Sequence, residues 1–319
     1  MNTYENKRVL LIGGGGTLGT YTAKELLKLG ARVDVLCPEE KVSDNERLTF
    51  FRGMGTREIL EGLFEEVRYD GIVNFIHYPK PLEYKDIHGF LMSNTDHLIF
   101  LSSYRVYANE QHPVTETAPR LYDVETDPYL IDRETYAISK SICEDFLRNE
   151  HAGENWTIVR PVISFSHRRL DLLLYSGHEV LDYAAKGLEM PMPETVRNYS
   201  AGIDWSGNSG KLIAHLLFKK EAIGETFNVY SGHGMTWGEV ADVYAEITGV
   251  KIRWCPEKEF LDYIYKFKND GWYWKYDRAY NRDIDCSKIL KVTGLTQSDF
   301  ATVKEGIQAE LDILKYQKK

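Results

Sequence analysis

The fold of this chain is decided by residues 9–19, which read Val9-Leu10-Leu11-Ile12-Gly13-Gly14-Gly15-Gly16-Thr17-Leu18-Gly19. The four apolar residues are typical of a buried strand, and residues 21–29 have the apolar spacing of a helix that stops at Gly30. Glycines at positions 13, 16 and 19 permit a tight turn, a backbone close to a pyrophosphate, and close packing of helix on sheet. The free N–H groups at the start of the helix favour phosphate. The stretch therefore predicts the phosphate-binding turn of a dinucleotide site.

Short apolar runs alternate with helical stretches throughout the first half of the chain. Further strands are expected at residues 32–36, 71–76, 97–102 and 156–160. A helix is expected over residues 137–149, before the last of these strands. Continuous apolar strands that alternate with helices are typical of a parallel sheet covered on both faces. We therefore predict an α/β fold with a Rossmann-type doubly wound parallel sheet, in which residues 1–165 form an NAD(P)-binding domain.

The second half of the chain has a different pattern, with short strands expected at residues 226–229 and 251–254 between helices. The aromatic residues at 271–276 are interpreted as packing rather than as a ligand cage. We assign residues 166–319 mainly to a smaller C-terminal α/β substrate-binding lobe. Residues 200–222 are expected to return to the first domain.

Composition and charge narrow the class of protein. The 319 residues include 39 Lys and Arg against 48 Asp and Glu, which gives a net charge of −9. An acidic chain is a poor binder of nucleic acid or of an anionic membrane surface, so neither is expected as a partner. The first apolar run is too short for a signal peptide or a membrane span, and the 4 cysteines form no close pair. A cytoplasmic protein with reduced thiols is expected.

The second expected strand ends at the place where a Rossmann domain reads the ribose of adenosine. An acidic side chain there accepts from the ribose hydroxyls of NAD, whereas a nearby Arg suits the 2′-phosphate of NADP. The position is Cys37, followed by Pro38, Glu39 and Glu40. Asp34 should point to the other face, because side chains alternate along a strand. Two carboxylates would repel a 2′-phosphate, so NAD is the favoured cofactor and NADP stays open.

Tyr136 and Lys140 lie four residues apart, which places a phenol and an ammonium on one face of a helix. A phenol is a poor base at neutral pH because its reference pKa is about 10, and a neighbouring cation lowers that pKa. Ser102 and Ser103 stand at the carboxyl end of an expected strand, where ligands bind in doubly wound sheets. Together these residues predict a catalytic site. No His, Cys or carboxylate cluster has metal-ligand spacing, so no metal is expected.

In these features the sequence resembles an extended short-chain dehydrogenase/reductase of the NAD-dependent epimerase/dehydratase family, and within it the nucleotide-sugar epimerases. The resemblance rests on the glycine turn, on Tyr136-x-x-x-Lys140, and on residues 102–107, which read Ser-Ser-x-x-Val-Tyr. Arg160-Pro161 after the last strand of the first half adds to it. Later stretches also match the family pattern, at residues 197–204, 224–232 and 285–295. The resemblance covers nearly the whole chain.

The resemblance implies a role for each matched residue. Ser103 would hydrogen-bond the reacting oxygen, Tyr136 would be the general acid/base, and Lys140 would bind the nicotinamide ribose and lower the pKa of the tyrosine. Arg197 and Arg278 match arginines that grip the substrate pyrophosphate, although surface salt bridges stay an alternative. The expected cofactor-binding residues are Gly13, Gly16, Thr17, Leu18, Gly19, Cys37, His77, Tyr136, Lys140 and Pro161. The expected substrate-binding residues are Ser103, Tyr104, Arg197 and Arg278. For His77, a structural hydrogen-bonding role is an equal alternative.

Departures from the family pattern bear on the substrate. Sugar 4,6-dehydratases of this family carry an Asp-Glu pair where this chain has Tyr104-Arg105, so water elimination is disfavoured. Met54 stands where an Asp near the adenine is usual, and the stretch after Pro161 lacks the usual Asn. These changes leave the pose of the substrate open.

Three functions follow from these features. The first is an NAD-dependent epimerase that acts on a nucleotide sugar through a transient keto intermediate. The second is an NAD(P)-dependent dehydrogenase or reductase of a sugar or another carbonyl substrate. The third is a non-catalytic relative that binds a dinucleotide or RNA, because a fold does not fix a function. A homodimer is expected from the family resemblance, and the partner is expected to be a small-molecule substrate.

Overall fold

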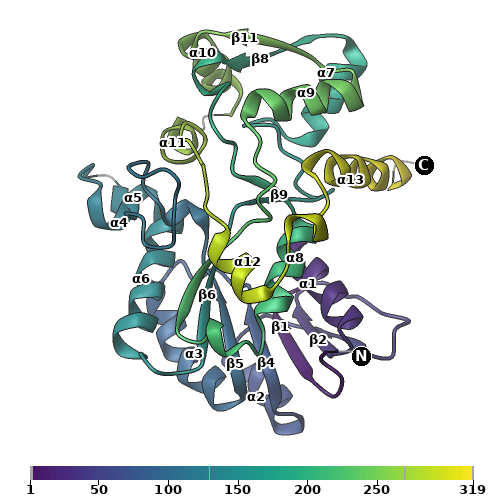
Figure 1. The fold of residues 1–319 in the computed structure, drawn as a ribbon, viewed down its shortest axis with the longest axis vertical. Coiled ribbons are helices and arrows are strands. Elements are labelled where there is room, and N and C mark those ends of the chain that lie inside the picture. Colours follow the sequence, from purple (N-terminus) through teal and green to yellow (C-terminus); the bar gives the residue numbers. More distant parts are fainter. Residues whose placement is uncertain (1–2, 129, 269–270, 318–319) are drawn as a thin grey trace.

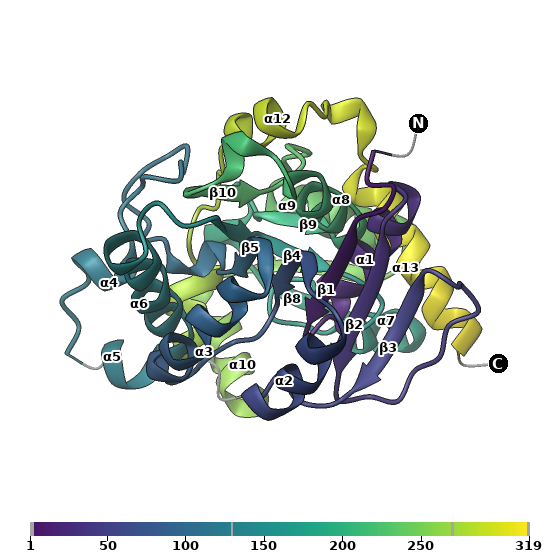
Figure 2. The same ribbon diagram turned by 90° about the horizontal axis from the view of Figure 1, so that it is seen from below.

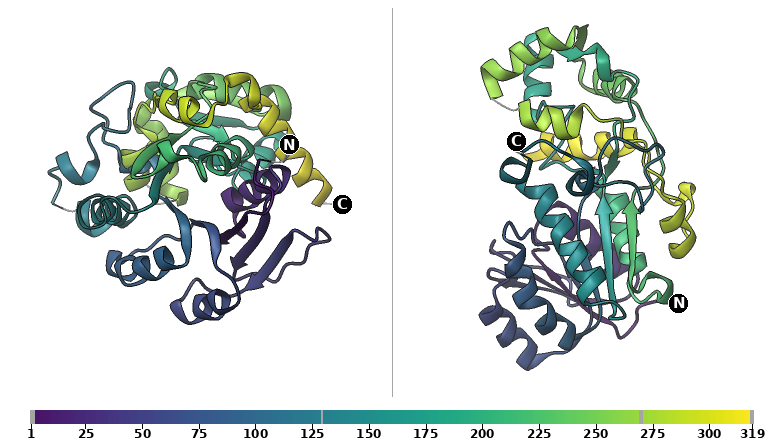
Figure 3. Two further views of the ribbon diagram at one scale, coloured as in Figure 1. Left: turned by 60° about the horizontal axis from the view of Figure 1, so that its bottom comes forward. Right: turned by 90° about the vertical axis from the view of Figure 1, so that its left-hand side faces the viewer.

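The structure is a computed structural model, which describes residues 3–128, 130–268 and 271–317. Two lobes lie one above the other along the long axis (Figure 1). The lower lobe holds the N-terminus and a seven-stranded sheet, and two further sheets have two strands each. The side view in Figure 3 shows the same stacking of the lobes.

The large sheet is parallel throughout, in the order β10-β6-β5-β4-β1-β2-β3. Its strands are β1 Arg8–Ile12, β2 Arg32–Cys37, β3 Leu48–Arg52, β4 Tyr69–Asn74, β5 Thr95–Leu101, β6 Trp156–Pro161 and β10 Glu225–Val229. In the interior strand β1, Leu11 pairs with Val35 on one side and Val73 on the other. Continuous apolar runs suit these strands because both faces of the sheet are covered.

Helices pack on both faces of the sheet (Figure 2). One face is covered by α1 Thr17–Lys28, α8 Ser206–Leu216 and α12 Ser287–Thr293. The other face is covered by α2 Arg57–Glu66, α3 Pro81–Ser93 and α6 Thr135–Glu150. Short helices α4 Leu121–Val124 and α5 Leu130–Arg133 precede α6. This double cover makes the doubly wound architecture predicted from the sequence.

The second lobe has its own apolar core. Its parallel strand pairs are β7 Ile163–Phe165 with β9 Ile203–Trp205, and β8 Glu189–Pro193 with β11 Lys251–Cys255. Its helices are α7 Gly177–Lys186, α9 Trp237–Thr248, α10 Glu257–Lys268, α11 Gly271–Tyr273 and α13 Val303–Gln317. Capping boxes fix the starts of α7 and α9, through Ser176 with Glu179 and Thr236 with Glu239.

The predicted α/β fold with a Rossmann-type sheet is confirmed. Two details differ from the sequence reading. The strand expected at residues 226–229 is β10, which joins the large sheet beside β6 instead of the second lobe. The strand expected at residues 71–76 ends at Asn74, and the side chain of Asn74 accepts from the backbone N–H of Ile76 in the following turn.

The division into domains stays a prediction. Helix α8, within the expected return at residues 200–222, packs on α1 of the first domain. Among the helices of the described residues, none is long and apolar enough to cross a membrane.

Candidate active site

A cavity of about 400 Å³ opens beyond the carboxyl ends of β1, β5 and β6. This is the edge at which parallel doubly wound sheets bind ligands. The predicted site residues that line it are Gly13, Gly16, Thr17, Leu18, Gly19, Ser103, Tyr104, Tyr136 and Pro161. The predicted site residues outside its lining are Cys37, His77, Lys140, Arg197 and Arg278.

The glycine turn forms one side of the cavity. Gly13 has a φ of +72°, a left-handed conformation that side chains other than glycine rarely adopt. A Cβ on Gly19 would lie 2.3 Å from the Cα of Gly14, so the helix start can approach the turn only without a side chain. Among the described residues, no heavy atom lies within 4 Å of a Cβ built on Gly16. Gly16 also caps α1 without a side-chain hydrogen bond, so the first N–H groups of the helix are left for a ligand.

The end of β2 carries both signs of charge. The buried Cys37 thiol donates to the carbonyl oxygen of Glu39 at 3.5 Å. Lys41 Nζ and Arg168 Nη1 both donate to the carbonyl oxygen of Gly15, at 2.6 and 3.1 Å. These two cations were not predicted here, and they offset the carboxylates that favoured NAD over NADP.

Asp34, on β2, points to the other face of the sheet, as predicted. Its Oδ2 accepts from Arg8 Nε and from the Tyr69 hydroxyl, each at 2.8 Å. Asp34 is therefore engaged in the core beneath β1 and is turned away from the end of β2.

Tyr136 lies in the first turn of α6 and lines the cavity. The helix is fixed at this point because the Glu134 side chain accepts from the N–H of Ala137 at 3.2 Å. Burial raises the pKa of Tyr136, whereas a hydrogen bond with Ser103 and the charges of Arg105 and Arg169 lower it. The phenol is therefore protonated at neutral pH but lies among the groups that stabilise its phenolate.

Lys140 lies beneath this surface rather than in it. Its ammonium donates to the carbonyl oxygens of Leu101 and, at 3.1 Å, of Ile76. Burial lowers the pKa of Lys140 to about 8. The charges that lower the pKa of Tyr136 in this structure are those of Arg105 and Arg169, and the role given to Lys140 stays a prediction.

His77 packs its ring against that of Tyr136, with 4.7 Å between the centroids. Its Nε2 shares a hydrogen bond of 2.9 Å with the Ser139 hydroxyl. Burial, followed by the charges of Lys140 and Arg105, lowers the pKa of His77 to about 4, so its ring is neutral at pH 7.

The lining of the cavity also includes Arg105, Arg169 and Tyr273, which we call the arginine–tyrosine wall. The Arg105 guanidinium lies 5.2 Å from the ring centre of Tyr136 and 4.8 Å from that of Tyr273. Arg169 Nη2 donates to the Tyr273 hydroxyl at 3.1 Å. The sequence reading missed this wall. It noted the Tyr104-Arg105 departure, but it interpreted the aromatic stretch with Tyr273 as packing rather than as part of a ligand site.

Residues 9–172 match the model of the NAD dependent epimerase/dehydratase family. The chain belongs to this family. The match contains the glycine turn, Ser103, Tyr136 and Lys140, and it ends just beyond Arg169.

Relatives and structural neighbours agree with this assignment. The UDP-glucose 4-epimerase of Neisseria meningitidis serogroup A is 30% identical over 182 residues, which are 48% of this chain and 51% of that protein. The chain thus spans about half the length of the curated relatives it matches. The Thermotoga maritima UDP-glucose 4-epimerase, solved with UDP-glucose, has a TM-score of 0.70 at 17% identity, covering 98% of this chain and 100% of that one. Bordetella bronchiseptica WbmH, solved with NAD+, has a TM-score of 0.69 at 18% identity, covering 97% and 98%. At these identities the structures show a common fold.

Two arginines that the family resemblance singled out are already engaged within the protein. Arg278 is buried, pairs with Asp277, and donates to the carbonyl oxygen of Leu173 and the Tyr104 hydroxyl, each at 3.0 Å. The Tyr104 hydroxyl in turn donates to Asp277 at 2.6 Å. A direct grip on a ligand by Arg278 would require these bonds to break.

Arg197 lies in the second lobe with 47% of its side chain exposed. Its guanidinium pairs with Glu194 at 3.4 Å and lies over the ring of Trp254, 5.0 Å from the centre. This position corresponds to the surface salt bridge that was the alternative for Arg197.

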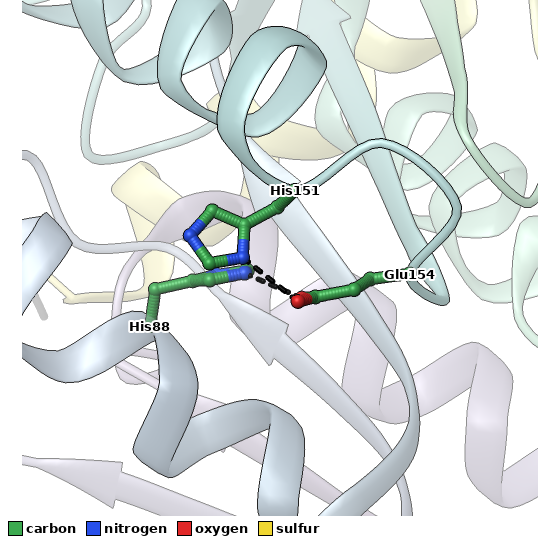
Figure 4. A group of neighbouring side chains, drawn as sticks. All are labelled: His88, His151 and Glu154. Carbon is green, nitrogen blue, oxygen red and sulfur yellow. Dashed lines mark hydrogen bonds and ion pairs between the residues drawn. The ribbon is translucent and has the colours of Figure 1, made fainter.

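Away from the cavity, the fold brings together three side chains of metal-ligating type (Figure 4). His88 of α3 and His151 beyond α6 bond to opposite oxygens of Glu154, at 3.0 and 2.8 Å. Spacing in the sequence did not reveal this group, because its members come from two separate segments. The hydrogen bonds satisfy the three side chains as a link between α3 and the loop after α6.

Proposed function

We propose that this protein is an NAD-dependent epimerase that acts on a nucleotide sugar through a transient keto intermediate. The observation that carries the proposal is that one cavity is lined by the phosphate-binding turn, by Ser103 and by Tyr136. A cofactor bound by its phosphates at the turn thus shares the cavity with the hydroxyl groups that handle the reacting oxygen. The similarity to UDP-glucose 4-epimerases supports the nucleotide-sugar class.

The residues present fit a dinucleotide. The open space above Gly16 and the uncapped start of α1 suit a pyrophosphate, and the close contact at Gly19 lets the backbone reach it. Glu39 and Lys41 flank the place for the adenosine ribose. A nicotinamide bound here would supply the reversible hydride transfer that the epimerisation needs.

The part of the reaction that the side chains of the protein would carry out is proton transfer. The Ser103 hydroxyl would hold the reacting oxygen while Tyr136 removes the hydroxyl proton and later returns it. Arg105 and Arg169 stabilise the phenolate that forms during this transfer, because both charges lower the pKa of Tyr136. Lys140, fixed by two carbonyl oxygens, would present its ammonium to the nicotinamide ribose from below.

The experiment has two readouts on the purified protein. Denaturation releases any dinucleotide for identification, and incubation with UDP-glucose is followed for UDP-galactose without added cofactor. Near-stoichiometric NAD and epimerisation are expected, since a redox-neutral cycle retains its cofactor. An empty protein that binds NADH or NADPH reversibly and reduces a carbonyl would replace the epimerase by a reductase. A protein that binds neither would point to a non-catalytic role.

A further inference from the structure

The arginine–tyrosine wall lies in a region with more positive than negative charge. The charged groups that meet there are Arg105, Arg169, Arg278, Arg282, Glu134, Asp171 and Asp277. Four guanidinium groups thus share three carboxylates. Arg282 Nη1 donates to the carbonyl oxygen of Tyr107, and its Nε and Nη2 have no hydrogen-bond partner among the described residues. Because buried charge is costly unless it is compensated, this excess favours an anion in the cavity.

Arg105 also has unused donor capacity beside the reacting centre. Its Nη2 pairs with Glu134 at 2.6 Å. Its Nε is buried without a hydrogen-bond partner among the described residues and lies 3.9 Å from the nearest oxygen of Asp277, beyond hydrogen-bond range. The guanidinium lies against the ring of Tyr136, so an acceptor that it meets belongs to the part of the substrate that reacts.

Arg169 is the second arginine in the lining of the cavity. Nearly half of its side chain is exposed, and its bonds to Asp171 and Tyr273, each at 3.1 Å, use Nε and Nη2. Its Nη1 makes no hydrogen bond or ion pair with the residues that the structure describes, and Arg169 lines the cavity. Arg105 and Arg169 both act on Tyr136 by charge, so they lie within electrostatic reach of the same ligand group.

We propose that the substrate carries a carboxylate on or beside its reacting carbon, and that Arg105 and Arg169 bind it. The inference rests on the proposed function for the identity of the reacting centre. A carboxylate matches the planar donor fork of a guanidinium. The pyrophosphate of a nucleotide sugar is a different anion. It is attached on the far side of the sugar from the carbon that reacts, so it does not compensate the positive charge beside Tyr136. A nucleotide sugar that carries a carboxylate is thus the preferred substrate, and a neutral one such as UDP-glucose binds the same site more weakly.

The test measures dissociation constants on the NAD-loaded protein with probes that differ in one group. UDP-glucuronate and UDP-glucose share the nucleotide and pyrophosphate and differ only in the carboxylate. Free glucuronate and glucose form a second pair without the nucleotide. Titration calorimetry is run on the natural protein, on Arg169→Gln, and on Arg253→Gln, whose arginine forms a similarly exposed ion pair with Glu259. Arg169 is chosen over Arg105 because loss of Arg105 would leave Glu134 buried and unpaired.

The natural protein is expected to prefer UDP-glucuronate to UDP-glucose by at least about tenfold, as one charge-assisted hydrogen bond provides. Arg169→Gln should remove most of this preference while changing the affinity for UDP-glucose less than about twofold, and Arg253→Gln should keep it. Equal binding of the two probes, or a preference that survives Arg169→Gln, overturns the proposal. If neither nucleotide sugar binds, the nucleotide-sugar function fails and the free sugars decide: an Arg169-dependent preference for glucuronate upholds the carboxylate site, and its absence overturns it.

Discussion

The two sides of the cavity are built in different ways. The glycine turn comes from one continuous segment, residues 13–19, and offers backbone N–H groups and empty space. The arginine–tyrosine wall comes from three separate segments and offers side-chain charge. The shape of the glycine turn depends on the absence of side chains. The charge of the arginine–tyrosine wall depends on which side chains it carries.

This difference helps to distinguish the features that a family shares from the features that are particular to one member. The turn proposed to bind the cofactor is made of backbone, and at Gly19 it leaves no room for a side chain. A wall made of side chains changes its ligand when a few residues change, as where Tyr104-Arg105 replaces an acidic pair. The cofactor side therefore indicates the reaction type, while the wall indicates the substrate.

The largest effect is expected at Tyr136, which lines the cavity together with the glycine turn and the wall. Tyr136→Phe removes the proton-transferring hydroxyl and should lower kcat by about a thousandfold. The ring and its contacts with His77 and Arg105 remain, so retained NAD should stay near that of the natural protein. The matched control is Tyr265→Phe, an exposed tyrosine of α10. Turnover that survives Tyr136→Phe would remove Tyr136 from the mechanism.

The next largest effect is expected at Gly19 in the glycine turn. Gly19→Ala would place a Cβ 2.3 Å from the backbone of Gly14, and such overpacking should cost about 1–3 kcal/mol of unfolding free energy. Chemical denaturation measures this loss, and the NAD released on denaturation should fall with it. Gly62→Ala in α2, where a Cβ meets open space, should instead stabilise by about 0.5–1 kcal/mol. Equal effects of the two substitutions would contradict the close approach at Gly19.

A smaller effect, on the pH dependence of catalysis, is expected when Arg169 of the arginine–tyrosine wall is replaced. The charge of Arg169 lowers the pKa of Tyr136, so Arg169→Gln should raise that pKa. The base works deprotonated, and the limb on which kcat rises with pH should therefore move to higher pH, by about half a unit. A pH profile of kcat, with Arg253→Gln as the control, measures the shift. A shift to lower pH would mean that Arg169 does not act on the phenol through its charge.

The cofactor side could be predicted from the sequence because its information is local. Gly13, Gly16 and Gly19 lie within seven residues, and each position has one geometric demand that glycine meets. Tyr136 and Ser103, which both line the cavity, could be singled out because each follows a strand or opens a helix of a regular alternation. The continuous apolar strands predicted the sheet for the same reason.

The wall could not be predicted because its members meet only in the folded chain. Arg105, Arg169 and Tyr273 are far apart in sequence, and no spacing rule connects them. Arg278 shows the converse case: its motif position suggested a ligand contact, which stays a prediction, and in the structure it pairs with Asp277, one residue away, in the core. Whether an arginine meets a ligand or a carboxylate depends on neighbours that a linear pattern does not contain.

The smallest effect is expected at Arg197. It tests whether the substrate-binding surface extends beyond the arginine–tyrosine wall. The guanidinium lies outside the cavity lining, half exposed, in an ion pair of 3.4 Å with Glu194. Exposed pairs contribute at most about 1 kcal/mol, so Arg197→Gln should change KM less than about twofold. Steady-state kinetics beside Arg253→Gln, on the neighbouring strand β11, gives the comparison. A tenfold rise in KM for Arg197→Gln alone would mean that the second lobe moves Arg197 onto the substrate. The binding surface would then extend from the arginine–tyrosine wall across both lobes, and the pyrophosphate contact implied by the family resemblance would belong to Arg197.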